Sequence, residues 1–303
     1  MADLLTRSPS PLASDTLELW QAVVLGVVQG LTEFLPISSS GHLIIFPWLF
    51  GWPEAGLSFD AALHLGTLTA VSVYFWRDLY GMLRAVPSAL GAPWLAGRPN
   101  NDGLTVRHRD ARLGWLIAIG TVPGFLAGVL GEGAIDAAFH DPAHEQRAVV
   151  TIATMLIVVG LLMGAAERMA AHRRSMECLN WRDAVVVGVA QAVSLIPGTS
   201  RSGATLTAGL FREVRRADAA RFSFLLGVPL VLGAGLKSVF DAVQEGMSGT
   251  EVSLFLAGGF SSALVGFLAI WGLLRFLQRR STMLFVVYRI GLGLLLFGML
   301  LRG

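Results

Sequence analysis

Two short polar segments interrupt apolar stretches of the chain, and both carry residues that could transfer a phosphoryl group. In the first, Gln29 and Glu33 stand one helical turn apart, and Pro-Ile-Ser-Ser-Ser-Gly-His follows at positions 36–42. The second segment reads Pro-Gly-Thr-Ser-Arg-Ser-Gly at positions 197–203. Hydroxyl, imidazole and carboxylate groups can act as nucleophile or proton acceptor, and an arginine can hold phosphate oxygens with two parallel hydrogen bonds. The two segments therefore predict chemistry on an anionic substrate.

The composition identifies the solvent of this chain as lipid. Of 303 residues, 54% are apolar and only 15% are charged, with a mean hydropathy of +0.63. Such a chain has too few polar residues to bury all its apolar residues beneath a polar surface. The formal net charge of +2 is too small to indicate a nucleic-acid partner.

Apolar stretches divide into those that can cross a membrane and those that cannot. About 20 residues are needed to span the hydrocarbon, and six stretches meet that length: 58–76, 113–131, 148–166, 221–240, 252–274 and 283–301. Stretches 19–50 and 183–211 are broken by the polar segments, so each half is too short. Broken backbone at membrane depth is tolerated only inside protein or beside a wet cavity. We predict an all-α integral membrane protein with six full transmembrane helices and two re-entrant helical hairpins.

The two hairpins are similar in sequence. A shift of 162 positions aligns residues 22–41 with 184–203 and gives nine identities in twenty. We therefore divide the single membrane domain, 1–303, into repeat 1 at 19–166 and repeat 2 at 183–301, each a hairpin followed by three spans. Because three crossings reverse the chain direction, the second repeat is predicted to have inverted topology.

The arginines predict the orientation. Six, four, four and three arginines occur in segments 77–112, 168–182, 212–221 and 275–280, whereas segments 132–147 and 241–251 have one and none. Basic segments stay on the cytoplasmic side. Both termini are then outside, one hairpin enters from each face, and the two turns meet near the midplane. The active site is expected to open to the outer, periplasmic side.

The returning half of each hairpin begins at its polar break, and this creates an anion site. Helix N-termini present free N–H groups and partial positive charge, and Arg201 adds a full charge. The predicted phosphate ligands are Arg201, Ser200, Ser202, Ser38, Ser40 and Gly41. The repeats differ where chemistry would require it, since Glu33 aligns with Leu195 and Ser39 aligns with Arg201. A charge at membrane depth costs about 2.5–3.5 kcal/mol, which favours a functional role.

The motifs resemble those of a known family, the undecaprenyl-diphosphate phosphatases, also known as bacitracin-resistance proteins. Residues 29–42 look like the family's glutamate and serine–histidine motif, and residues 197–205 resemble its arginine motif. Phe75-Trp76-Arg77, Phe222-Ser223-Phe224-Leu225-Leu226 and Tyr288-Arg289 extend the similarity over most of the chain.

The resemblance implies an activity and a location. It implies hydrolysis of undecaprenyl diphosphate to undecaprenyl phosphate and inorganic phosphate in the bacterial cytoplasmic (inner) membrane. This reaction recycles the lipid carrier for peptidoglycan synthesis and confers bacitracin resistance. The implied functional residues are Glu33, Ser39, His42 and Arg201, with Gln29 and Ser200 beside them. The chain departs from the family pattern at Gln29, where glutamate is usual, at Ser40, where threonine is usual, and at His64, where glutamine is expected.

A mechanism can be assigned to the implied residues. Ser39 is the expected nucleophile, His42 the proton shuttle, and Arg201 with the half-helix amides the phosphate clamp. Glu33 either orients His42 or, with Gln29, binds a divalent cation, Mg²⁺ or Ca²⁺, that offsets the diphosphate charge. Direct phosphorylation of His42 is the rival route.

Other interpretations remain open for the whole chain and for single residues. Inverted repeats with broken helices are also the plan of transporters, so a flippase or secondary transporter of an anionic polyprenyl lipid is the alternative function. His64 is expected to be a hydrogen-bonded packing residue, and Arg289 is expected to reach the membrane surface from a span end. The expected partners are the polyprenyl diphosphate lipid and the bilayer, and a homodimer is compatible with the sequence.

Overall fold

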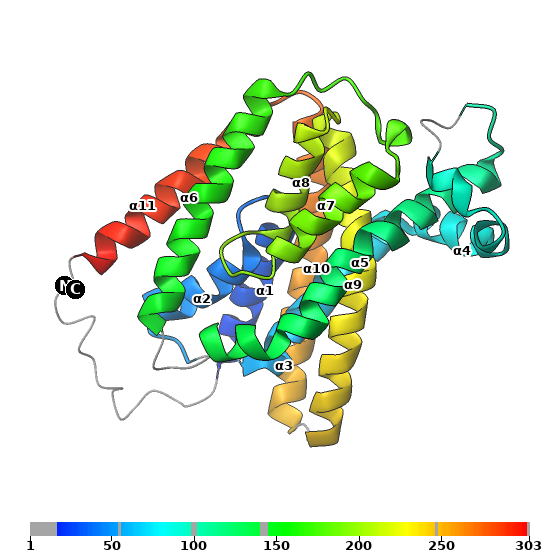
Figure 1. The fold of residues 1–303 in the computed structure, drawn as a ribbon. Coiled ribbons are helices and arrows are strands. Elements are labelled where there is room, and N and C mark those ends of the chain that lie inside the picture. The colour runs from blue at the N-terminus through cyan, green and yellow to red at the C-terminus, as the bar shows by residue number, and fades with distance from the viewer. Residues whose placement is uncertain (1–16, 54–55, 98–101, 140–144, 246–247, 302–303) are drawn as a thin grey trace.

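The computed structural model describes residues 17–53, 56–97, 102–139, 145–245 and 248–301, and this part of the chain is helical (Figure 1). Its α-helices are α1 (Leu19–Phe34), α2 (Ser39–Phe50), α3 (Gly56–Tyr74), α4 (Trp76–Leu90), α5 (Val106–Phe139), α6 (Glu145–Met169), α7 (Trp181–Val193), α8 (Arg201–Phe211), α9 (Arg216–Glu245), α10 (Gly249–Leu277) and α11 (Met283–Leu300). Two short 3₁₀ helices, η2 (Pro93–Gly97) and η4 (Met176–Cys178), lie in connections.

Five helices contain segments that are long and apolar enough to cross a membrane: α5, α6, α9, α10 and α11. They coincide with five of the six predicted spans. The sixth prediction falls on α3, which is 19 residues long and carries Asp60 and His64 in its first half, and which is not among these five. Large apolar side chains point away from the bundle, and Leu130 and Phe260 are 83% and 73% exposed. The chain is an all-α integral membrane protein, and these side chains face lipid.

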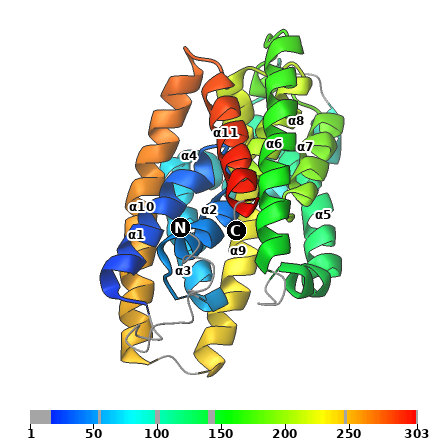
Figure 2. The same ribbon diagram turned by 90° about the vertical axis from the view of Figure 1, so that its left-hand side faces the viewer.

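The helices pack in a pattern that brings distant parts of the sequence together (Figures 1 and 2). Helix α10 packs against both α1 and α3, α5 packs against α7, and α6 packs against α11. The largest apolar core joins residues from α1, α3, α5, α6 and α7 to α11. The polar residues at the two helix breaks are buried in this bundle, with Ser38, Thr199 and Ser200 at most 5% exposed.

Both predicted helix breaks are present, and their backbones are alike. Ser38 precedes α2 with φ 80°, and its Oγ accepts a hydrogen bond from Gly41 N at 3.3 Å. Ser200 precedes α8 with φ 70°, and its Oγ accepts from Gly203 N at 3.0 Å. Residues other than glycine seldom adopt such φ values, which cost of order 1–3 kcal/mol. The same uncommon cap therefore begins the second helix of each hairpin.

The second hairpin is anchored at the arginine-rich end of the molecule, at the top of Figure 1. Asp183, in the first turn of α7, is fully buried and pairs with Arg174 and with Arg212, each at 2.6 Å. Glu167, near the end of α6, pairs with Arg216 at the start of α9 at 2.5 Å. A buried carboxylate is tolerated when it is paired and hydrogen-bonded. These pairs fix the ends of α7 and α8 and thereby the turn between them.

Candidate active site

The two hairpins meet at the carboxylate of Glu33, in the last turn of α1. Its Oε1 accepts a hydrogen bond from Arg201 Nη2 at 2.9 Å, across 168 positions of sequence. Its Oε2 accepts from Ser39 Oγ at 2.7 Å and from Gln29 Nε2 at 3.2 Å. Glu33 is only 6% exposed, and these donors offset the loss of its hydration. Three of the four residues predicted to be catalytic therefore lie in direct contact.

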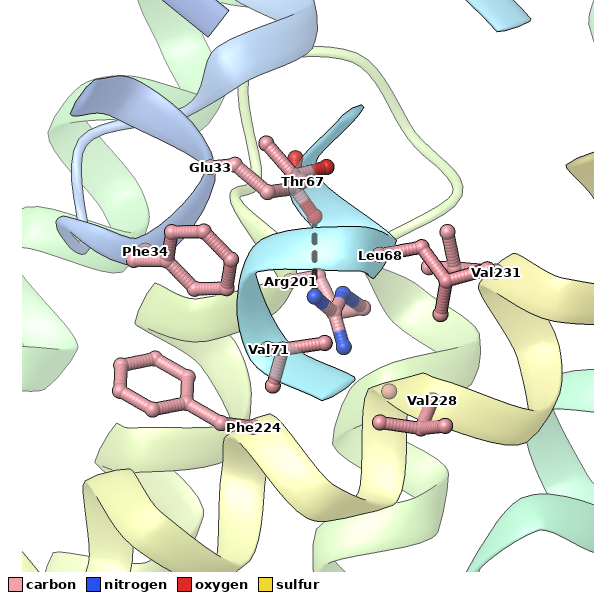
Figure 3. A pocket seen from close by; sticks show the side chains of 10 residues that line it. Glu33, Phe34, Thr67, Leu68, Val71, Arg201, Phe224, Val228 and Val231 are labelled. Carbon is pink, nitrogen blue, oxygen red and sulfur yellow. Dashed lines mark hydrogen bonds and ion pairs between the residues drawn. The ribbon is translucent and has the colours of Figure 1, made fainter. Parts of the chain in front are cut away.

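Arg201 is the first residue of α8 and lies beneath Glu33 in Figure 3. Its Nη1 is buried and has no hydrogen-bond partner among the described residues. A cavity of about 10 Å³, room for about one water molecule, separates the ion pair from apolar side chains that include Phe34, Val71 and Phe224. Since buried donors are normally satisfied, Nη1 is a donor available to a ligand.

Gly227 of α9 allows Arg201 to occupy this position. A Cβ atom built on Gly227 would overlap Nη1 and Cζ of Arg201 and would lie 2.8 Å from Nη2. The guanidinium thus lies directly against the backbone of α9. Sequence reasoning did not identify Gly227, because nothing near it in the chain indicates a contact with α8.

The remaining serines of the two breaks have structural partners. Ser202 Oγ donates a hydrogen bond to the backbone oxygen of Leu35 at 3.1 Å, and this bond connects the two breaks. Ser202 Oγ also lies 3.2 Å from Ser200 Oγ. Ser38 Oγ accepts a hydrogen bond from Gly41 N and lies 3.5 Å from Ser40 Oγ. Their predicted role as phosphate ligands stays a prediction.

His42 lies in the first turn of α2 and is held by groups other than Glu33. Its Nδ1 is 2.6 Å from the backbone oxygen of Ser38, and its Nε2 is 2.7 Å from the hydroxyl of Tyr288 in α11. The rings stack with centroids 5.8 Å apart and planes 12° apart. Because a carbonyl can only accept, we assign the proton to Nδ1, so Nε2 accepts from Tyr288. Ser38 and Tyr288 therefore orient His42, which was one of the roles expected for Glu33.

Arg289 does not reach the membrane surface, so that prediction is wrong. Its side chain is completely buried and donates to backbone oxygens of both breaks: Pro36 at 3.1 Å, Gly198 at 3.0 Å and Thr199 at 2.9 Å. It also donates to Leu156 and Met155 of α6. Broken helices leave carbonyl groups that must be satisfied inside the bundle, and one guanidinium, which has five N–H donors, serves both breaks. The signal in the sequence was an arginine inside an apolar span.

His64 of α3 lies at the edge of the site. Its Nδ1 is 2.8 Å from the backbone oxygen of Asp60, as expected for a hydrogen-bonded packing residue. Its Nε2 is also 3.9 Å from Glu33 Oε2, so it contributes to the surroundings of the carboxylate. Sequence reasoning had left His64 out of the site.

The oxygens available to a cation come from two residues. Among the described residues, no group of three or more histidine, cysteine, aspartate or glutamate side chains could hold a metal ion. Glu33 offers its carboxylate, and Gln29 offers Oε1, which is buried and without a partner in this part of the chain. Mg²⁺ commonly uses one or two protein carboxylates and completes its shell with substrate phosphates. Gln29 and Glu33 therefore fit a cation that arrives with a phosphorylated substrate.

Comparison with known proteins places these residues in a family. The model of the bacitracin resistance protein BacA family matches residues 22–295, which include both helix breaks. The chain belongs to this family. The undecaprenyl-diphosphatase of Thermomicrobium roseum is 50% identical over 284 residues, covering 92% of this chain and 97% of the relative. The undecaprenyl-diphosphatases of Moorella thermoacetica and Synechococcus elongatus are 45% and 43% identical, covering 91% and 93% of this chain and 95% and 93% of theirs.

Proposed function

We propose that this chain hydrolyses undecaprenyl diphosphate to undecaprenyl phosphate and inorganic phosphate. The observation that carries the proposal is the contact of Glu33 with both Ser39 and Arg201, in which a hydroxyl, a carboxylate and a guanidinium from two hairpins converge. This chain covers nearly the whole length of two relatives that carry the name of this activity. The reaction recycles the lipid carrier of peptidoglycan synthesis in the bacterial inner membrane and confers resistance to bacitracin.

In the first step, Ser39 Oγ attacks the terminal phosphorus of the diphosphate. The Oγ–P bond forms as the bridging P–O bond breaks, and undecaprenyl phosphate leaves with the electron pair of that bond. The proton of the Ser39 hydroxyl passes to Glu33 Oε2, which already accepts its hydrogen bond at 2.7 Å. Arg201 offsets the charge on the phosphoryl oxygens, with Nη1 as its unused donor.

In the second step, water attacks the phosphorus of the phosphoserine. The Oγ–P bond breaks, Ser39 recovers its proton from Glu33, and inorganic phosphate leaves. We assign His42 Nε2 as the acceptor of the proton from the attacking water. In the structure this nitrogen accepts a hydrogen bond from the Tyr288 hydroxyl at 2.7 Å. His42 then gives the proton to the departing phosphate. The lone pair of the same nitrogen makes direct phosphorylation of His42 the rival first step.

A divalent cation, Mg²⁺ or Ca²⁺, would be held by Glu33 and Gln29. When bound, such an ion supplies electrostatic neutralisation of the diphosphate oxygens. Gln29 contributes only a neutral oxygen to it, so Arg201 and the N–H groups at the start of α8 carry a large part of the charge compensation.

The proposed membrane arrangement has six spans, with α3 as the first, and two hairpins that enter from opposite faces as inverted repeats. The packing pattern supports the repeats. In the proposed repeats, α1, α3, α5 and α6 correspond to α7, α9, α10 and α11 in that order. The contact of α1 with α10 then corresponds to the contact of α7 with α5, and the contact of α3 with α10 corresponds to that of α9 with α5. All four contacts occur. The site would then open to the periplasmic side, since α1 and α2 enter from there.

Cysteine labelling tests this arrangement. The chain has one cysteine, Cys178, so Arg215→Cys in a Cys178→Ala background provides a single label site between α8 and α9. We expect labelling only after the cells are permeabilised. Labelling of intact cells from the outer face would contradict the orientation.

Phosphate release by the purified protein from undecaprenyl diphosphate, with and without a chelator, tests the function. A flippase or secondary transporter of the same lipid would keep the repeats and Arg201, but it does not need the hydroxyl of Ser39 hydrogen-bonded to a buried carboxylate. Release of phosphate by the wild-type protein and not by Ser39→Ala supports the enzyme. Lipid transfer across vesicles without any phosphate release would support the transporter.

A further inference from the structure

A second hollow, of about 850 Å³, lies outside the candidate active site. It is formed where the junction of α3 and α4 meets the start of α9 and the end of α10, and none of its lining residues belongs to the Glu33 cluster. Two tryptophans and three arginines line it: Trp76, Arg77, Arg221, Trp271 and Arg275.

The three arginines have different partners. Arg221 pairs with Asp78 at 2.6 Å, and its charge is largely offset. Arg77 and Arg275 lie over the rings of Trp76 and Trp271, with guanidinium carbons 5.5 Å and 4.6 Å from the ring centroids. Among the described residues, neither of these two forms an ion pair. Both residues line the hollow and are exposed.

Other groups of the hollow add to this positive potential or limit it. Helix α4 begins at Trp76, and its first N–H groups add partial positive charge, which Asp78 in the same turn partly offsets. Asp218 also lines the hollow, but its carboxylate interacts with Arg215 and Arg221. No carboxylate of the described residues pairs with Arg77 or Arg275, so the hollow keeps a net positive charge that suits an anion.

The position of the hollow indicates which anion. Arg77, Arg221 and Arg275 all belong to the arginine-rich segments at the ends of apolar helices. Trp76 and Trp271 are 57% and 46% exposed, and exposed tryptophans at helix ends lie at the membrane–water boundary. Basic pockets at such depths accept the headgroups of anionic lipids.

We propose that this hollow binds the headgroup phosphate of an anionic phospholipid from the surrounding leaflet. Arg77 and Arg275 donate hydrogen bonds to the phosphate oxygens, and the tryptophan rings contact the glycerol and the first part of the acyl chains. The site is separate from the one that carries the proposed hydrolysis, and it gives the enzyme a fixed contact with the leaflet at its arginine-rich end.

Lipid binding by delipidated protein, titrated with phosphatidylglycerol and read by native mass spectrometry, tests the proposal. The test variant is Arg77→Gln with Arg275→Gln. One arginine near a membrane surface contributes about fivefold to lipid affinity, so the double variant should bind about thirtyfold more weakly. Arg275→Gln alone should bind the lipid about fivefold more weakly, and this single variant replaces the double variant if the double variant does not fold. An unchanged melting temperature and rate of phosphate release show that a variant is intact.

Two controls separate this site from other sources of binding. Arg182→Gln removes another exposed arginine, which lies over Trp181 at 5.4 Å but outside the hollow, and should bind lipid like the wild type. Arg201→Gln weakens the candidate active site and should also keep the lipid. Equal binding by the double variant and the wild type would overturn the proposal. Equal binding of phosphatidylcholine, or full competition by inorganic phosphate, would overturn the assignment to an anionic phospholipid.

Discussion

Gly227→Ala tests whether the position of Arg201 determines turnover. The substitution adds one methyl group to α9 at the point where the guanidinium of Arg201 lies against the backbone. The methyl carbon would overlap Nη1, and restoring ordinary contact of about 3.5 Å requires a shift of roughly 2 Å. Such a shift separates Nη2 from Glu33 Oε1, now 2.9 Å apart, and displaces the donor proposed to bind phosphate.

The expected loss follows from the role of Arg201. Removing one fixed donor from a developing negative charge lowers turnover by roughly a hundred- to a thousandfold, ~3–4 kcal/mol. We expect a loss of this size in kcat/KM for phosphate release from undecaprenyl diphosphate by Gly227→Ala. The helix itself should not suffer, because alanine is favoured over glycine in a helix by about 1 kcal/mol.

The matched control is Gly233→Ala, on the same helix, where a Cβ meets nothing within 4 Å. It should keep wild-type turnover. In an Arg201→Ala background, Gly227→Ala should cost nothing further, because the group that the methyl displaces is already gone. Wild-type turnover of a folded Gly227→Ala protein would refute the argument, and so would additive losses in the double variant.

Three further substitutions test the other roles. Arg201→Lys keeps the charge but not the planar pair of donors, so phosphate release should fall roughly a hundredfold; near-normal rates would make Arg201 a structural counter-ion. Ser39→Ala should abolish release while Ser40→Ala costs little, and a phosphorylated His42 trapped in the Ser39 variant would exclude the serine route. Gln29→Glu should lower the Mg²⁺ or Ca²⁺ concentration needed for half-maximal activity, because a second carboxylate joins Glu33 one turn away; identical titration curves would show that residue 29 does not touch the cation.

Local patterns of the sequence predicted the local features of the structure. The polar segments at 36–42 and 197–203 predicted two helix breaks, and the helices end and begin there as expected. The inverted repeats also predicted that the two turns meet, whereas the contacts of Glu33 with Ser39 and with Arg201 were not predicted. Each of these predictions rested on residues adjacent in sequence or related by one shift of 162 positions.

The contacts that were missed connect helices that no local pattern relates. Tyr288 reaches His42 across 246 positions, and Arg289 reaches Pro36 across 253. Gly227 meets Arg201 only because α9 packs on α8. The position of Arg289 near the end of an apolar span suggested an exposed side chain, but the carbonyl groups left free by the two breaks bind it in the interior. Tertiary hydrogen bonding outweighed the tendency of an arginine to reach water.

The shared geometry of the two breaks explains how one frame supplies two different chemical groups. Ser38 and Ser200 adopt the same uncommon backbone conformation and cap the following helix in the same way. The residue after each cap therefore begins a helix at the same place in its hairpin, and in both cases its side chain reaches Glu33. Only the side chain differs, because Ser39 brings a hydroxyl to Oε2 and Arg201 brings a guanidinium to Oε1. The proposed nucleophile and the proposed phosphate clamp are thus equivalent positions of a repeated turn. Glu33 contacts both, whereas its counterpart in the second hairpin, Leu195, has no charge.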